Sequence, residues 1–124
     1  MRRPYGMAKI IRHPKLQKFI DLFNAELFFE AHEILEELWL VSHGEQKIFY
    51  QGLIQCAVAL AHWKKRNPRG AHQVGKRSFQ KLAKFGDSQE TIYVKKLIED
   101  CERFLAEEKQ QYPRIKTASD SVPE

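Results

Sequence analysis

Apolar residues recur along this chain with the spacing of α-helices. They fall three or four residues apart over most of its length, and no segment alternates apolar and polar residues over the length of a strand. The pattern predicts a single all-α domain at residues 14–108, a compact bundle of about five helices. The expected helices cover residues 14–25, 26–41, 45–66, 68–85 and 87–108.

Residues at the expected helix ends support these boundaries. Pro14 suits a first helical turn, and Asn67 before Pro68 predicts a capped start for the fourth helix. Gly44 is expected to end the second helix. The sequence DSQE at residues 87–90 has the form of a capping box, which predicts the start of the fifth helix.

The two ends of the chain are expected to lack fixed structure. Residues 1–13 are basic and are expected to be mobile. Residues 109–124 are polar and contain proline, so we expect a disordered tail.

The third predicted helix is the most apolar and is expected to lie at the centre of the bundle. Its middle, FYQGLIQCAVALAHW at residues 49–63, is apolar nearly all round. The exceptions, Gln51, Gln55 and His62, project within one narrow sector. Each needs a hydrogen-bond partner if it is buried, because an unpaired buried polar group costs ~1–3 kcal/mol.

The second predicted helix offers such partners. In FFEAHEILEELW, residues 28–39, His32 and Glu36 lie between a wide apolar arc and a second apolar pair, Phe29 and Leu40. His32 and Glu36 are then buried if the fifth helix or a second subunit covers Phe29 and Leu40. The sequence therefore predicts a buried polar cluster of His32, Glu33, Glu36, Gln51, Gln55 and His62, with Glu30, Trp39 and Asn67 at its margin.

Three segments in this order, FFEAHEILEELW, QGLIQCAVALAHW and NPRGA, resemble the family known only as domain of unknown function 309. The family comprises small all-helical proteins of bacteria, archaea and plastids, and the resemblance covers about residues 15–86. It implies a fold and no activity. The turn before FFEAHE often holds Gly in the family and reads NAEL here, which we expect to alter the turn and not the site. The resemblance marks as characteristic Glu30, His32, Glu33, Glu36, Trp39, Gly52, Gln55, His62, Asn67, Gly70 and Ala71.

Charged residues are sorted along the chain, which carries a net charge of +5. Seven carboxylates and no Lys or Arg lie between Phe19 and Lys47, whereas nine Lys or Arg and no carboxylate lie from Gln46 to Gly86. An acidic helix and a basic hairpin at residues 64–84 are therefore expected near each other. The basic surface comprises Lys64, Lys65, Arg66, Arg69, Lys76 and Arg77.

Three functional hypotheses follow. The favoured one is a non-enzymatic interaction or scaffold module, in which the cluster fixes helix register and the surface binds a protein partner or a second copy of the chain. The second is a metal-dependent, hydrolase-like enzyme with a divalent metal on His32, Glu36 and His62, although the HExxH motif is missing. The third is weak nucleic-acid binding through the basic hairpin.

The remaining features set the expected environment. Cys56 and Cys101 have neither disulfide-framework nor zinc spacing and are expected to be reduced, packed thiols. No secretory signal is recognised, and no apolar run approaches the ~20 residues of a membrane span. We expect a cytoplasmic protein, or one of the plastid stroma.

Overall fold

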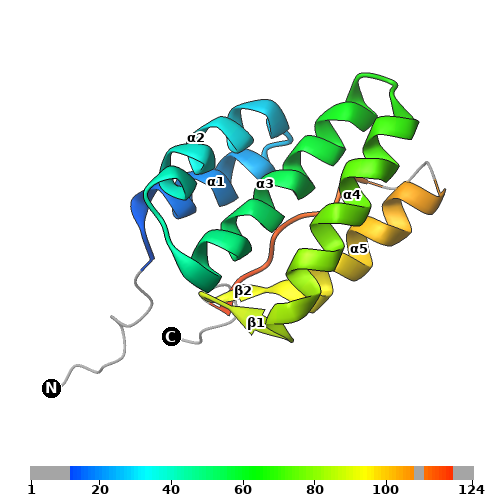
Figure 1. The fold of residues 1–124 in the computed structure, drawn as a ribbon. Coiled ribbons are helices and arrows are strands. Elements are labelled where there is room, and N and C mark those ends of the chain that lie inside the picture. Colours follow the sequence, from blue (N-terminus) through cyan, green and yellow to red (C-terminus); the bar gives the residue numbers. More distant parts are fainter. Residues whose placement is uncertain (1–11, 108–110, 119–124) are drawn as a thin grey trace, which may run out of the picture.

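Five α-helices and a short β-hairpin form the described part of the chain (Figure 1). The computed structural model describes residues 12–107 and 111–118. The prediction of a compact all-α bundle is confirmed. The elements are α1 (Pro14–Asn24), α2 (Phe28–Leu40), α3 (Gly44–Lys64), α4 (Pro68–Leu82), the 3-10 turn η2 (Ala83–Phe85), β1 (Ser88–Gln89), β2 (Ile92–Tyr93) and α5 (Val94–Glu107).

Each helix packs against the next along the chain, so α3 lies between α2 and α4, while α1 lies against α2 and α5 against α4 (Figure 1). The predicted central position of the apolar third helix is confirmed. Most of the α3 circumference is buried, including Phe49, Leu53 and Leu60. Among the described residues, no helix combines the length and apolar content that crossing a bilayer requires.

Gly52 lets α4 approach α3 closely. A Cβ atom placed on Gly52 would lie 2.8 Å from Leu82 Cδ2, which is closer than real Cβ atoms approach. At the same crossing the Ser78 hydroxyl donates a hydrogen bond of 2.7 Å to the Gly52 carbonyl. This bond satisfies a hydroxyl that is fully buried.

The predicted cap of the fourth helix is confirmed, because the Asn67 side chain accepts a 3.0 Å hydrogen bond from the Gly70 amide. The predicted role of Gly44 is wrong. The second helix already ends at Leu40, and Gly44, with φ +62°, is the first residue of α3.

The predicted capping box at residues 87–90 is also wrong, because Ser88–Gln89 pairs with Ile92–Tyr93 as an antiparallel hairpin and the fifth helix begins only at Val94. The turn residues Glu90 and Thr91 have φ values of 47° and 68°.

Contacts from distant parts of the chain hold this turn. The Glu90 carboxylate accepts hydrogen bonds from the Tyr50 hydroxyl, at 2.8 Å, and from the Gln46 amide, at 3.1 Å. Burial and the Glu90 carboxylate raise the pKa of Tyr50 well above its usual value.

The predicted disordered tail is wrong for residues 111–118, which run from beyond α5 back to the hairpin (Figure 1). Tyr112 packs on Phe28 and Phe104, with ring centroids 5.3 and 4.6 Å apart. Asn24 bonds both backbone groups of Ile115, at 3.0 and 2.7 Å. These contacts bury Ile115 and Thr117, which outweighs the polar composition of the segment. Residues 109–110 and 119–124 lie outside the described residues.

The predicted mobile N-terminus falls mainly on residues 1–11, which lie outside the described residues. Arg12 and His13 are described, and both make contacts. Arg12 hydrogen-bonds Gln17 and Thr91, and His13 Nδ1 accepts a 3.0 Å bond from the Lys15 amide at the start of α1.

We expect Glu26→Gly to stabilise the protein. Glu26, in the NAEL turn, has φ +65°, where a side chain costs about 1 kcal/mol or more. Glycine removes that cost but gains entropy when unfolded, so the net gain in unfolding free energy should be about 0.5 kcal/mol. Urea unfolding measures it. Glu99→Gly, on an exposed position of α5, is the control and should cost about 1 kcal/mol. Equal losses at both sites would contradict a conformational cost at Glu26.

Asn24→Ala should release the C-terminal segment, because it removes both bonds to Ile115. We expect a loss of about 1–3 kcal/mol in unfolding free energy and faster tryptic cleavage after Arg114 and Lys116. Limited proteolysis followed by mass spectrometry measures the cleavage rate. Lys18→Ala, on the exposed side of α1, is the control. Unchanged cleavage in Asn24→Ala would show that other contacts hold the segment.

Candidate functional site

The residues of the predicted cluster line one side of the α2–α3 hairpin, which we call the polar face. Phe29, His32, Glu36 and Leu40 follow each other at three- or four-residue spacing on α2, and Gln51, Gln55, Val58 and His62 do so on α3. These eight residues define the face. None of them is fully buried.

The prediction that the cluster is buried is wrong for the single chain. Glu33 and Glu36 are exposed, while His32, Gln51, Gln55 and His62 are half-buried. Phe29 and Leu40, expected to be covered, are 52% and 65% exposed. The fifth helix packs against α4 and not over α2, so it leaves this side open.

His32 and His62 line one hollow of about 230 Å³, together with Phe29, Val58, Ala61 and Lys65. His32 Nδ1 lies 2.6 Å from the Phe29 carbonyl, which can only accept, so Nδ1 carries the proton. His62 Nδ1 lies 3.2 Å from the Asn67 side-chain nitrogen, which can only donate, so Nδ1 of His62 accepts. In their neutral forms the two rings are therefore opposite tautomers, with Nε2 an acceptor in His32 and a donor in His62.

The bond between Asn67 and His62 depends on Gly70. A Cβ atom on Gly70 would lie 2.5 Å from the Asn67 side-chain nitrogen and 3.2 Å from His62 Cγ. Asn67 caps α4 with its oxygen and orients His62 with its nitrogen. Asn67, expected at the margin of the cluster, is thus in contact with it.

Two buried polar atoms beside the polar face have no hydrogen-bond partner within the described part of the chain. They are Gln55 Oε1, an acceptor, and Trp39 Nε1, a donor. Leaving such groups unpaired costs about 1–3 kcal/mol each. The Trp39 ring instead lies under the Lys47 ammonium, 4.7 Å from its centroid.

The structure does not support the predicted metal set. Among the residues described, no three His, Cys, Asp or Glu side chains are grouped so that they could hold a metal ion. His32 and His62 share a hollow, but Glu36 does not line it. Glu33, another member of the predicted cluster, is exposed.

The basic residues of α4 point in different directions. Lys76 lines a groove between α4 and α5. Lys81 lies next to α3, where its Cβ would be 3.4 Å from a Cβ on Gly52, and Arg77 lies one helical turn before it. Lys65 lies over the Phe29 ring, 5.7 Å from its centroid. The predicted basic residues are exposed, and the polar line of α3 runs between an acidic α2 and a basic α4.

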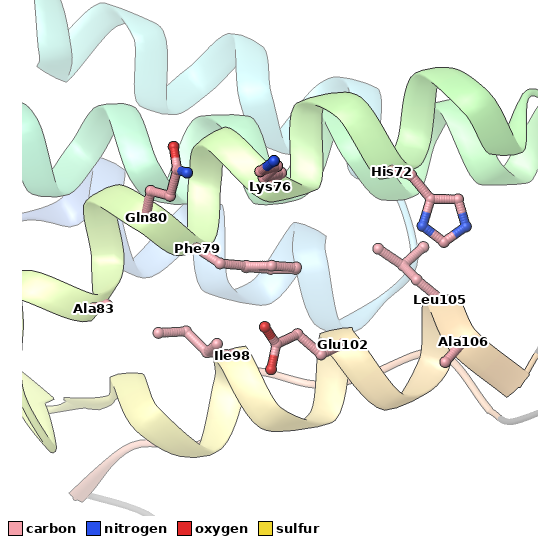
Figure 2. A pocket seen from close by; sticks show the side chains of 9 residues that line it. All are labelled: His72, Lys76, Phe79, Gln80, Ala83, Ile98, Glu102, Leu105 and Ala106. Carbon is pink, nitrogen blue, oxygen red and sulfur yellow. The ribbon is translucent and has the colours of Figure 1, made fainter.

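The groove between α4 and α5 was not predicted from the sequence (Figure 2). It encloses about 550 Å³ and has an apolar lining that includes Phe79, Ile98 and Leu105. Lys76 comes from α4 and Glu102 from α5, so the two sides carry opposite charges (Figure 2). The amphipathic spacing of Ile98 and Leu105 is the one signal that could have indicated it.

Comparisons with known proteins identify relatives without a described activity. An uncharacterized protein of Aquifex aeolicus (strain VF5) is 40% identical over 67 residues, which cover 53% of this chain and 20% of that protein. The uncharacterized protein YpuF of Bacillus subtilis (strain 168) is 36% identical over 65 residues, 50% of this chain and 37% of that protein. The chain thus spans less than two fifths of either relative.

A solved structure shares the fold. The crystal structure of the conserved hypothetical protein TTHA0068 from Thermus thermophilus aligns with a TM-score of 0.68 and 24% identity. The alignment covers 77% of this chain and 99% of that one.

The family model named Domain of unknown function (DUF309) matches residues 16–74, a shorter stretch than the expected 15–86. This stretch holds most of α1, all of α2 and α3 and the first half of α4, and with them the whole polar face. Residues 16–74 therefore match the DUF309 family model, as the resemblance of the three segments predicted.

Proposed function

We propose that the chain is a non-enzymatic interaction module whose polar face binds a second copy of the chain. The observation that carries this proposal is the exposure of Phe29 and Leu40 on the same side of α2 as His32 and Glu36. Large apolar side chains grouped on one surface indicate a protein interface, and polar groups between them add specificity.

The charges around the polar face favour a second copy over an unrelated partner. Glu33 and Glu36 lie on α2, and Arg77 and Lys81 lie on the side of α4 next to α3. Two copies placed face to face about a twofold axis parallel to α3 bring α2 of each copy opposite α4 of the other. Carboxylates then meet cations on both sides of the axis, so the face is complementary to itself.

The other twofold axis that joins the same faces, perpendicular to α3, is disfavoured. It places α2 opposite α2 and α4 opposite α4, so like charges meet. When the twofold axis is parallel to α3, the side-chain amides of Gln51 and Gln55 lie near that axis.

The two alternative functions receive less support. A metal enzyme would need a third ligand beside His32 and His62, and Glu36 does not line their hollow. Nucleic-acid binding favours cations gathered on one surface, whereas Lys76 lines the groove between α4 and α5 and Lys81 lies next to α3.

Leu40→Glu should convert a dimer into a monomer. A carboxylate at this position would be buried in the interface without a partner, so we expect the dimer dissociation constant to rise about 30-fold or more. Sedimentation velocity over a concentration series measures it. Val41→Glu is the matched control, because Val41 is 69% exposed but points away from the polar face. Wild-type protein that is monomeric up to about 100 µM would refute the proposal.

Two charge-reversed variants should recognise each other but not themselves. Glu33→Lys/Glu36→Lys makes the α2 side of the polar face basic, like the α4 side. Arg77→Glu/Lys81→Glu makes the α4 side acidic, like the α2 side. For each variant alone, the dimer dissociation constant should be about tenfold or more above that of wild type. An equimolar mixture of the two variants should form a heterodimer. Native mass spectrometry at low salt distinguishes the species, and added salt should weaken the heterodimer. Homodimers that persist in both variants would contradict the pairing of α2 with α4.

A further inference from the structure

Cys56 of α3 and Cys101 of α5 meet in the core, although 45 residues separate them in the sequence. Their Sγ atoms lie 3.4 Å apart, and each residue is 1% exposed. Both thiols are free. The sequence predicted reduced, packed thiols and not that they touch, so their direct contact is new information from the fold.

We propose that Cys56 and Cys101 form a redox-sensitive disulfide site that ties α5 to α3. A covalent S–S bond is about 2.05 Å long, so the two sulfurs have to approach by little more than 1 Å. Side-chain rotation supplies much of such a movement, because both thiols already point at each other. The site is independent of the polar face and of dimer formation.

The oxidant is a low-molecular-weight disulfide, R–S–S–R, such as oxidised glutathione. One cysteine thiolate attacks a sulfur of the oxidant and releases RS⁻, which leaves a mixed disulfide on the protein. The second cysteine thiolate attacks the protein sulfur of this mixed disulfide and releases the second RS⁻. The two protons lost by the cysteines give two RSH. One S–S bond breaks and one forms, and two electrons pass from the protein to the oxidant.

Burial makes this reaction depend on the movement of α5. The hydrogen bond with Cys56, followed by burial, raises the pKa of the Cys101 thiol, so the reactive thiolate is scarce in the closed structure. Neither sulfur is accessible to an oxidant until α5 separates from α3. The oxidation rate should therefore level off at high oxidant concentration, where the opening of α5 limits it.

The disulfide would join the family segment to a part of the chain outside it. Cys56 lies within residues 16–74, whereas Cys101 lies on α5, beyond the family match. One helical turn either side of Cys101, Ile98 and Leu105 face α4 across the groove (Figure 2). Oxidation would therefore fix α5, which forms one side of this groove, whereas in the reduced protein α5 is held by packing alone.

The test is to unfold and refold the full chain in a glutathione redox buffer, then to alkylate free thiols under denaturing conditions. Both cysteines are accessible during refolding, so burial cannot prevent the reaction. We expect a monomer that has lost two hydrogens, takes up no alkylating agent and yields a tryptic peptide pair joined through Cys56 and Cys101. Its thermal midpoint should exceed that of the reduced protein by roughly 10 °C.

The double variant Cys56→Ala/Cys101→Ala should show no shift of its midpoint between the two buffers. Cys56→Ala alone should leave Cys101 free or joined to one glutathione. Persistent free thiols in refolded wild-type protein would overturn the proposal. Separate glutathione adducts on both cysteines, or disulfides between chains, would overturn it as well.

Discussion

The contact between Gly52 and Leu82 decides which sides of the central helix are covered. Because position 52 has no Cβ, α4 packs tightly against α3, and the Ser78 hydroxyl completes the crossing through the Gly52 carbonyl. α5 follows α4 through the hairpin and packs against α4 and, at Cys101, against α3, so it does not cover the polar face. As a result, the line of Gln51, Gln55 and His62 remains open on one side of α3, while residues 111–118 close part of the core elsewhere. A larger residue at position 52 would push α4 outward and change the width of the polar face as well as the stability of the fold.

Helix positions were predictable from the sequence because they depend on local signals. The cap at Asn67 and the apolar spacing within α3 both act within a few residues, and the structure confirms them. The hairpin was not predictable in the same way. DSQE satisfies the letters of a capping box, but the Glu90 carboxylate is taken by Tyr50, 40 residues away, and Thr91 bonds Arg12 from the start of the chain. Likewise, Ile115 is ordered by Asn24, a contact over 91 residues that composition does not encode.

The candidate site was predictable in direction but not in environment. Periodicity correctly placed His32 and Glu36 on one side of their helix and Gln51, Gln55 and His62 on one side of the next. Whether such a side is buried depends on a further element, and the fifth helix lies elsewhere. In the proposed dimer, the second copy buries the polar face, which the single chain leaves exposed. The opposite tautomers of His32 and His62 follow from backbone and side-chain partners that only the folded structure reveals.

The C-terminal segment also brings the two ends of the described chain together. Arg12 and Ala118 both bond Thr91, one through its side chain and the other through its amide, at 2.8 Å from the Thr91 carbonyl. A domain whose ends are adjacent can be inserted into a loop of another protein, or reconnected end to end and opened elsewhere, without disturbing its core. Because its ends are adjacent, such a domain can be joined to a longer polypeptide at a single place on its surface. A domain joined at Arg12 or at Ala118 would therefore meet the bundle beside the turn at Thr91.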